Sequence, residues 1–322
     1  MTLFNHRNID QAYELINTNI IKTPLVSNDY INQITGGNIL FKLENLQITG
    51  SFKFRGASHK ILKLTESTKK NGIVAYSSGN HGQAVAYASK LNDINAKIVM
   101  PTTAPKIKIN NTKKYGAEII LYNPETELRE SIAEELANQE NRTIIKPYDD
   151  QDIIAGQGTA AKEIVADLKS LKIVPDLYLC CCGGGGLIAG TSTYLKYAFP
   201  NIYSYSVEPI DFDDTKNSLE RGEIVSNFPG KKSICDALLT PEPGKLTFTI
   251  NQSTLQGGLV VSEEEVKKTI IILAENLKII TEPGGAVAAA AVIYNKINVK
   301  NKNVVVMISG GNIDSEIFLS LK

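Results

Sequence analysis

The sequence predicts an α/β protein built around open, mostly parallel sheets. Two observations lead to this class. Short β-branched or apolar runs alternate along the chain with helical patterns, as in parallel strands that are joined by helices. Several of these runs end in turns rich in glycine, serine or asparagine, which is where ligands bind at the carboxyl ends of parallel strands. Because 322 residues make about two domains of ordinary size, we expect two lobes.

The same pattern places the elements along the chain. The predicted strands cover residues 72–76, 96–100, 176–182, 203–208 and 304–308. Helical patterns follow at residues 83–91, from Leu187 onward and at 125–140. Residues 67–146 hold two of the strand and helix units and the charged helix, which is enough for a small mobile lobe. Residues 1–66 and 147–322 would then form one large lobe, each lobe having its own sheet flanked by helices.

Composition and charge narrow the class of protein. Hydrophobic residues make up 43% of the chain, and 34 basic side chains balance 34 acidic ones, so no broad field attracts nucleic acid or anionic lipid. The apolar stretch 286–294 is too short to cross a bilayer, and the first residues lack the apolar core of a signal peptide. We expect a cytoplasmic protein without nucleic-acid or membrane partners. A run of lysines is expected on a solvated helix face: Lys106, Lys108, Lys113 and Lys114.

The four cysteines do not predict a disulfide framework in a chain of this size. Cys180, Cys181 and Cys182 are consecutive, and successive side chains of a strand point to opposite faces. They therefore cannot converge on one tetrahedral zinc ion, and we expect them to be small buried residues.

Lys53 is the first candidate for chemistry. In the segment 50–57, Ser51 is a plausible N-cap, which puts Lys53 in the first helical turn between two aromatic residues. Aromatic surface and a helix N-terminus both disfavour the charged ammonium, as a Schiff-base lysine requires. The alternative is an ordinary solvated lysine.

Two turns that follow strands are suited to anions. The turn 77–82 combines short hydroxyl and amide side chains with a helix N-terminus, which suits a carboxylate, although an N-capped tight turn has the same pattern. Glycines 183–186 let the backbone approach a phosphate before the next helix begins. This turn also fits a loose dinucleotide pattern with Glu208 as the ribose acid, so a dinucleotide-binding oxidoreductase is an alternative, as is a non-catalytic binding protein.

Six segments in order resemble the fold-type II pyridoxal-phosphate enzymes, whose fold is that of the tryptophan synthase β subunit. Within this family the chain is most similar to the branch of serine/threonine dehydratases (threonine ammonia-lyases) and serine racemases. The segments, which span nearly the whole chain, are 51–57, 77–83, 155–159, 183–186, 282–285 and 309–312. The resemblance implies a pyridoxal 5′-phosphate cofactor and a small amino-acid substrate.

The resemblance also implies roles for individual residues. Lys53 would bind the aldehyde of the cofactor, and in the racemases Ser78 would return a proton on the opposite face of the ring. The implied cofactor-binding residues are Phe52, which packs on the ring, Lys53, Asn80 at the phenolic oxygen, Gly183, Gly184, Gly185, Gly186 and Leu187 at the phosphate, Glu282, and Ser309 at the pyridine nitrogen. The residues implied around the substrate carboxylate are Ser77, Ser78, Gly79, Asn80 and His81.

The implied reaction is β-elimination, the dehydration and deamination of a β-hydroxy amino acid such as threonine or serine to a 2-oxo acid and ammonia. A neutral hydroxyl at the pyridine nitrogen makes the ring a weaker electron sink, which favours elimination over a long-lived carbanion. Serine racemase and threo-3-hydroxyaspartate dehydratase are the alternatives on the same scaffold. The relatives form dimers or tetramers, so a homodimer or homotetramer is expected.

The remaining expectations concern a metal and three details. The relatives' pattern places Mg²⁺ or Ca²⁺ on Glu208, the Phe212 carbonyl and Asp214, where a solvated acidic turn is the alternative. Arg129 could meet a second substrate carboxylate, but a surface pair with Glu125 on one helix is favoured. We expect that Tyr148 could border the pocket. Ala237 stands where many relatives have a glycine near the cofactor. We expect no regulatory domain, because too few residues follow residue 312.

Overall fold

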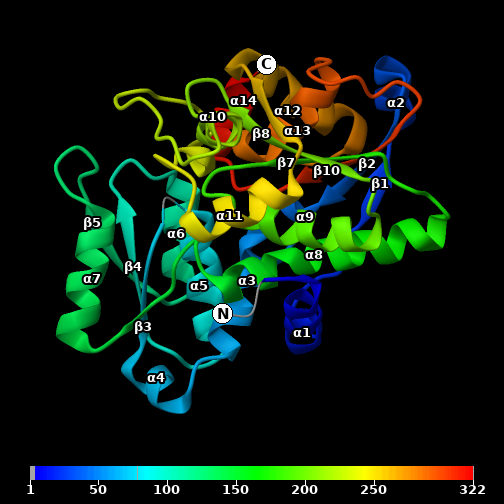
Figure 1. The fold of residues 1–322 in the computed structure, drawn as a ribbon. Helices are drawn as coiled ribbons and strands as arrows, with labels where there is room; N and C mark the ends of the chain where they lie inside the picture. The colour runs from blue at the N-terminus through cyan, green and yellow to red at the C-terminus, as the bar shows by residue number, and fades with distance from the viewer. Residues whose placement is uncertain (1–3, 78, 322) are drawn as a thin grey trace.

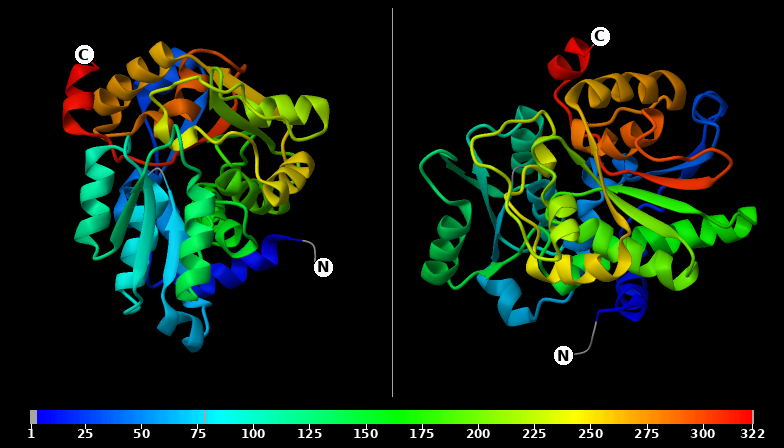
Figure 2. Two further views of the ribbon diagram at one scale, coloured as in Figure 1. Left: turned by 90° about the vertical axis from the view of Figure 1, so that its left-hand side faces the viewer. Right: turned by 45° about the horizontal axis from the view of Figure 1, so that its top comes forward.

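The computed structural model describes residues 4–77 and 79–321 and contains two sheets (Figures 1 and 2). The larger sheet is six-stranded, and only its edge strand β1 pairs in the antiparallel direction, with β2. Its strands, in spatial order, are β1 (Leu25–Ser27), β2 (Asn38–Leu43), β10 (Asn303–Ile308), β7 (Leu177–Cys181), β8 (Tyr203–Pro209) and β9 (Gly257–Val261). Its central register places Val305 opposite both Leu40 and Tyr178.

The smaller sheet is four-stranded and entirely parallel. Its strands, in spatial order, are β5 (Glu118–Tyr122), β4 (Ala96–Pro101), β3 (Ile73–Tyr76) and β6 (Thr143–Ile144). All four strands come from residues 67–146, which we call the small lobe; the rest of the chain is called the large lobe. That these ranges move as separate bodies stays a prediction.

Helices cover both sheets. Those before residue 150 are α1 (His6–Ile16), α2 (Asp29–Thr35), α3 (Lys53–Leu62), α4 (Glu66–Asn71), α5 (Asn80–Lys90), α6 (Lys106–Lys114) and α7 (Arg129–Glu140). Those after it are α8 (Gln151–Leu171), α9 (Gly186–Ala198), α10 (Asp214–Arg221), α11 (Lys245–Thr254), α12 (Glu263–Leu277), α13 (Pro283–Ile293) and α14 (Ser315–Ser320). Short 3₁₀ turns are η1 (Glu44–Leu46), η2 (Ile48–Gly50) and η3 (Asp236–Leu238).

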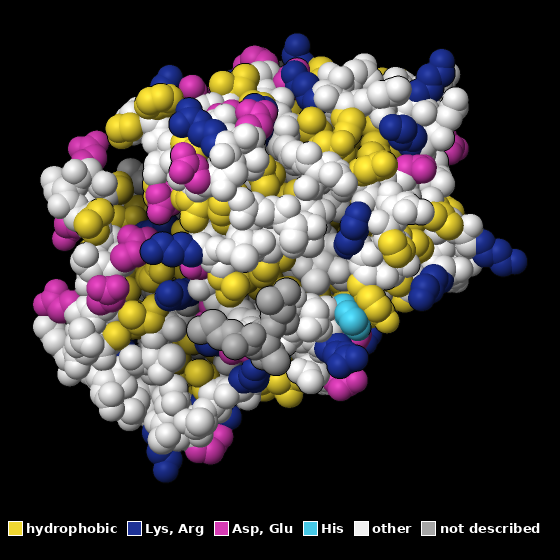
Figure 3. Space-filling model, in the orientation of Figure 1, with side chains coloured by type: hydrophobic (Ala, Val, Ile, Leu, Met, Phe, Trp, Pro, Cys, Tyr) yellow, Lys and Arg dark blue, Asp and Glu magenta, His cyan; other side chains and the backbone are white. Residues whose placement is uncertain are grey.

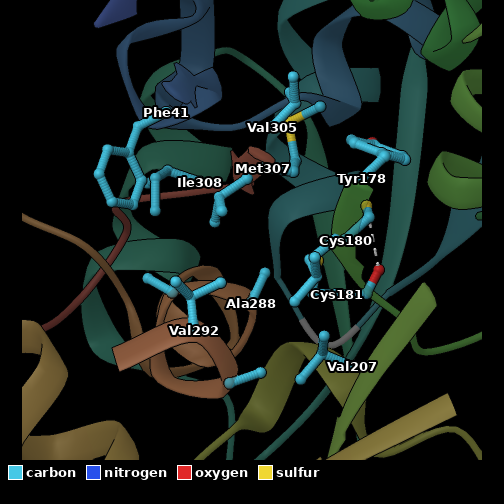
Figure 4. Close-up of a cluster of buried hydrophobic side chains, with 14 of the residues drawn as sticks. Phe41, Tyr178, Cys180, Cys181, Val207, Ala288, Val292, Val305, Met307 and Ile308 are labelled. Carbon is cyan, nitrogen blue, oxygen red and sulfur yellow. Dashed lines mark hydrogen bonds between the residues drawn. The ribbon is translucent and has the colours of Figure 1, made fainter. Parts of the chain in front are cut away.

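The main core lies around the central strands β10 and β7. Because helices cover both faces of the sheet, the residues of these strands are apolar on both faces, and polar residues do not alternate with them. Helix α13 is apolar all round and packs on one face, while α8 and α9 lie on the other (Figure 1). Figure 4 shows Met307 and Ile308 of β10 among Phe41, Val292 and Cys181. The three consecutive cysteines are buried within this cluster, as predicted.

The five predicted strands are confirmed, with ends that shift by at most one residue. Helix α5 begins three residues earlier than predicted, at Asn80, and α7 begins four residues later, at Arg129. Helix α3 packs against both α5 and α8, and its residues Phe54 and Ile61 belong to the same apolar cluster as the small sheet. The helix that starts at Lys53 is therefore held between the two sheets.

No helix within residues 4–77 and 79–321 is long and apolar enough to cross a membrane. On the face shown in Figure 3, basic and acidic side chains are interspersed rather than gathered by sign.

Candidate active site

A cavity lies between the two lobes, at the carboxyl ends of the strands that the glycine- and serine-rich turns follow. Its walls come from β3 and the turn before α5, from the start of α3, from the turn before α9, from η3 and from the residue after β10. The residues that line it are Phe52, Lys53, Tyr76, Ser77, Asn80, His81, Arg129, Pro147, Tyr148, Cys181, Gly183, Gly184, Gly185, Leu187, Ala237, Leu238, Thr240 and Ser309. Segments far apart in the sequence thus meet at one site.

Lys53 is the first residue of α3; its side chain is half-buried, and its amine lies in the cavity that the residue lines. Burial lowers the pKa of this amine to about 8, and the nearby Arg129 charge acts in the same direction. The Nζ atom donates a hydrogen bond of 2.7 Å to the Pro147 carbonyl and lies 5.2 Å from the centre of the Phe52 ring. The residue that precedes the helix is Phe52 rather than Ser51, which instead forms an isolated bridge with Gly310. The predicted N-cap was therefore wrong, although Lys53 does lie in the first turn.

A fully buried ionic network fixes α3 at Arg55, two residues beyond Lys53. The Arg55 guanidinium contacts Glu44 at 2.7 Å and Glu163 at 2.8 Å, and the Lys42 ammonium lies 2.6 Å from Glu163. These four side chains have 0% or 1% of their surface exposed. Two cations and two carboxylates of four separate elements are thus paired away from water, which holds the start of α3 against β2, η1 and α8.

The turn between β3 and α5 forms a second wall. Because α5 begins at Asn80, the first backbone N–H groups of this helix have no partner within the helix and are available to an anion. Ser77 is buried and its Oγ accepts a hydrogen bond from the Gly79 N–H. His81 contacts the Ile145 carbonyl through Nε2, and burial lowers its pKa to about 3, so the ring is neutral. Ser78 lies outside the described residues.

The side chain of Asn80 is oriented at both ends. Its Nδ2 donates to Glu282 Oε1, and its Oδ1 accepts a 2.9 Å hydrogen bond from Asn312 Nδ2. An amide nitrogen carries two hydrogens, so one of them stays available toward the cavity that Asn80 lines. Glu282 is 1% exposed and is fixed in turn by Lys108, whose Nζ lies 2.7 Å from its Oε2.

The glycine turn forms the third wall and leads into α9. At Gly184 a Cβ atom would lie 2.3 Å from the Tyr148 ring, and Gly185 has a positive φ of 88°. The turn therefore needs glycine both for close approach and for its backbone path. Ser309 follows β10 at the opposite side, and its carbonyl accepts a hydrogen bond from the Phe52 N–H. The residues predicted for the phosphate, the ring and the pyridine nitrogen thus line a single cavity, except Gly186, which begins α9 and is not among the lining residues.

Two basic residues lie elsewhere than predicted. Arg129 does not pair with Glu125, which precedes α7; its Nε lies 2.7 Å from Glu130, and its guanidinium stacks on Tyr76 in the cavity. Lys108 is not on a solvated face but is completely buried, because its ammonium reaches Glu282 across the lobes. The favoured surface pair of Arg129 was therefore wrong, while its place in the cavity fits the alternative in which it meets the substrate. The burial of Lys108 escaped sequence reasoning because it depends on contacts with distant segments.

Tyr148 and Ala237, which the sequence analysis singled out, both line the cavity. Tyr148 borders the cavity, as predicted. Ala237 lies in η3 and lines the cavity, and it is not among the residues with a positive φ. Alanine therefore fits the local backbone path without strain, where many relatives have glycine.

The predicted metal residues are not among those that line this cavity; Glu208 lies near the end of β8, Phe212 lies between this strand and α10, and Asp214 is the first residue of α10. Glu208 accepts hydrogen bonds of 2.9 Å from the backbone N–H groups of Thr215 and Lys216. Asp214 is buried, and its Oδ2 has no hydrogen-bond partner among the described residues. Burial raises the pKa of Asp214 to about 7 and that of Glu208 well above its ordinary value. No cluster of three His, Cys, Asp or Glu side chains that could hold a metal occurs within the described ranges.

Comparisons with known proteins identify the family. A model of the family described as pyridoxal-phosphate-dependent enzyme matches residues 16–310. This chain belongs to that family. It is 41% identical over 311 residues to a serine racemase of Dictyostelium discoideum, covering 96% of this chain and 94% of the relative. It is also 41% identical to a catabolic L-threonine dehydratase of Staphylococcus aureus, covering 95% and 88%. The solved maize serine racemase superposes with a TM-score of 0.92 at 31% identity, covering 98% and 96%.

The protein is thus a pyridoxal-phosphate-dependent enzyme of the serine/threonine dehydratase and racemase branch, and its fold is that of the fold-type II enzymes. The cavity fits the cofactor of the family. Lys53 offers a buried amine of lowered pKa, and the glycine turn at the start of α9 offers backbone N–H groups for a phosphate. This assignment also removes Glu208 from the role of a ribose acid, because its carboxylate accepts hydrogen bonds from α10.

Proposed function

We propose that this enzyme catalyses the dehydration and deamination of a β-hydroxy amino acid, such as threonine or serine, to a 2-oxo acid and ammonia. The single observation that carries the proposal is the buried Lys53 amine, whose pKa of about 8 leaves part of it neutral near neutral pH. It lies between a turn suited to a carboxylate and a turn suited to a phosphate. The 41% identity to a threonine dehydratase supports the same reading.

Pyridoxal phosphate, when bound, withdraws electrons from the substrate α-carbon. We propose a role in binding or in proton transfer for the residues of each wall of the cavity. The neutral Lys53 amine would take the α-proton as general base. The N–H groups at the start of α5, with Ser77 and Ser78, would hold the substrate carboxylate. Glycines 183–186 and the Leu187 N–H would hold the phosphate, Phe52 would pack on the ring, and Asn80 would donate to the phenolic oxygen.

Ser309 would meet the pyridine nitrogen. Because its hydroxyl is neutral, it does not hold that nitrogen protonated, and this favours departure of the β-hydroxyl over a long-lived carbanion. Loss of the α-proton and the β-hydroxyl leaves an enamine, which water hydrolyses to the 2-oxo acid and ammonia. Serine racemase is the alternative, supported by the 41% identity to a racemase; it requires Ser78 to return a proton to the α-carbon.

A second candidate activity is the dehydration of threo-3-hydroxyaspartate, and Arg129 favours it. Its guanidinium lies over the Tyr76 ring and lines the same cavity as Lys53, which places a cation where it could meet a second substrate carboxylate. Charge-assisted hydrogen bonds from arginine to a carboxylate are strong and geometrically specific.

One assay separates these activities. Release of 2-oxo acid and ammonia is measured from serine, threonine and threo-3-hydroxyaspartate in both enantiomers, together with the chirality of remaining substrate. A dehydratase releases both products, whereas a racemase inverts the substrate without releasing them. We expect Arg129→Met to lower kcat/KM about 100-fold for hydroxyaspartate, but less than about tenfold for threonine. An equal decrease in kcat/KM for the two substrates would show that Arg129 does not bind a second carboxylate.

We further propose that Glu208, the Phe212 carbonyl and Asp214 hold Mg²⁺ or Ca²⁺. Two buried carboxylates with raised pKa values and one unpartnered oxygen, Asp214 Oδ2, support this, since a divalent cation would stabilise both in the ionised form. A ligand at 100 times its Kd stabilises the folded state by about 2.7 kcal/mol. We expect either cation to raise the thermal midpoint of chelator-treated protein by several degrees.

The control for the metal is Asp214→Asn, which removes the charge with little change in shape and should abolish the shift. A midpoint that neither chelator nor added cation changes, in the protein with Asp214 intact, would contradict the proposal.

A further inference from the structure

Lys108 is a buried cation that joins the two lobes. It lies on α6 of the small lobe, and its side chain has 0% of its surface exposed. Its Nζ lies 2.6 Å from Asp236 Oδ2 and 2.7 Å from Glu282 Oε2, both in the large lobe. We call these three residues the interlobe triad. A buried lysine that faces two carboxylates is costly to separate from them, so the triad favours the arrangement in which the lobes meet.

The triad extends into the active site through Glu282. The other oxygen of this carboxylate, Oε1, accepts a hydrogen bond from Asn80 Nδ2. Since Asn80 Oδ1 faces Asn312, the amide has only one orientation that satisfies both neighbours. Glu282 is itself confined, because a Cβ atom on Gly310 would lie 2.0 Å from its Oε1. The position of the Asn80 amide therefore depends on a carboxylate that Lys108 holds.

The stem of Lys108 also supports the backbone of the turn before α5. A Cβ atom on Gly79 would lie 2.1 Å from Lys108 Cδ, so the lysine methylenes fill the space where any other side chain would project. Gly79 is the N-cap of α5 and lies between Ser77 and Asn80. The Lys108 side chain thus packs against Gly79 and also, through Glu282, fixes the position of the Asn80 amide.

We propose that Lys108 is a positioning residue that couples the approach of the two lobes to the orientation of Asn80 and of the turn 77–81. The proposal rests on the proposed role of Asn80 at the cofactor, but the coupling itself is a property of this chain alone. Without the ammonium, the buried Glu282 carboxylate would face Asp236 without a cation. Burial and the Asp236 charge already raise the pKa of Glu282, and Lys108 is the group that opposes them.

The test compares three variants of the holoenzyme. Lys108→Met keeps the apolar stem and removes the charge, Lys108→Arg keeps the charge, and Lys113→Met makes the same charge change at an exposed position of the same helix. Three quantities are measured: hydrogen exchange of the peptide covering residues 79–90, the absorption bands of the bound cofactor, which respond to the hydrogen bond at its phenolic oxygen, and kcat/KM.

We expect Lys108→Met to speed exchange of the 79–90 peptide at least about tenfold, to change the band ratio, and to lower kcat/KM about 100-fold, as small misplacements of catalytic groups do. Lys108→Arg should restore most of all three, and Lys113→Met should match the unmodified protein. If Lys108→Met matches it too, the proposal is wrong.

A double variant and a measurement without cofactor test the proposal further. If Lys108→Met does not fold, the paired variant Lys108→Met with Glu282→Gln removes the uncompensated charge; it should fold, yet retain fast exchange. Slow exchange in that variant would show that the ion pair is not needed for positioning. Exchange is also measured without cofactor, where Lys108→Met must still loosen the 79–90 peptide. A protein that fails to bind pyridoxal phosphate at Lys53 therefore refutes the proposed function without deciding this inference.

Discussion

Replacing Lys53 with alanine is expected to lower the rate of product release at least about 10⁴-fold, because one amine would serve both as the covalent attachment point and as the general base. The variant should also lose the borohydride-stable label that the unmodified protein carries at this position. Phe52 and the start of α3 should keep their packing, since within the described part of the chain Lys53 donates a single hydrogen bond, to the Pro147 carbonyl. The fold, checked by thermal unfolding, should therefore be retained.

The pH dependence of cofactor uptake checks the same amine independently. Only a neutral amine attacks an aldehyde, and the Lys53 amine is neutral above its pKa of about 8. The rate of pyridoxal phosphate binding to cofactor-free protein should rise about tenfold per pH unit up to pH 8 and then level off. A rise that continues toward pH 10.5, the ordinary value for lysine, would mean that Lys53 is solvated rather than buried. An exposed lysine such as Lys113, measured by its rate of acylation, is the matched reference.

The parts of the site that the sequence could predict are those with local signals. An apolar run followed by four glycines indicates a strand and a turn without reference to any other segment, and strand β7 and the glycine turn before α9 lie where expected. That this turn binds a phosphate stays a prediction. Lys53 stood out because of its aromatic neighbours and the turn before it. Each of these features depends on backbone geometry within a few residues, which is what sequence patterns record.

The parts that escaped prediction depend on distant partners. Lys108 belongs to a lysine-rich helix, and only its contacts with Asp236 and Glu282 bury it. Strand β9 opens with two glycines and β6 has two residues, so neither has a strand pattern of its own. Strand β2 has a lysine as its fifth residue, which locally indicates an exposed strand, but Glu163 pairs with this lysine and allows it to be buried. In each case long-range pairing overrides the local pattern.

The buried ionic network behind Lys53 leads to the second large expected effect. Arg55→Met should lower the free energy of unfolding by about 3 to 5 kcal/mol, because it leaves Glu44 and Glu163 buried with Lys42 as the one remaining cation of the network. This is a large part of the roughly 5 to 15 kcal/mol that stabilises a typical domain. Urea-induced unfolding measures the loss. Lys22→Met breaks an ion pair whose lysine is 58% exposed, and should cost less than about 1 kcal/mol.

The physical origin of that loss can be separated from a loss of packing. If uncompensated charge is responsible, neutralising the stranded carboxylates by Glu44→Gln and Glu163→Gln in the Arg55→Met background should recover part of the stability, with Lys42→Met added to remove the last charge. If the loss of packing around the guanidinium is responsible instead, the variant that combines all four substitutions should be no more stable than Arg55→Met alone. Because the network fixes α3 at Arg55, only two residues after Lys53, the affinity for the cofactor should fall together with the stability in Arg55→Met. The affinity should recover only in variants in which the start of α3 returns to its position in the unmodified protein.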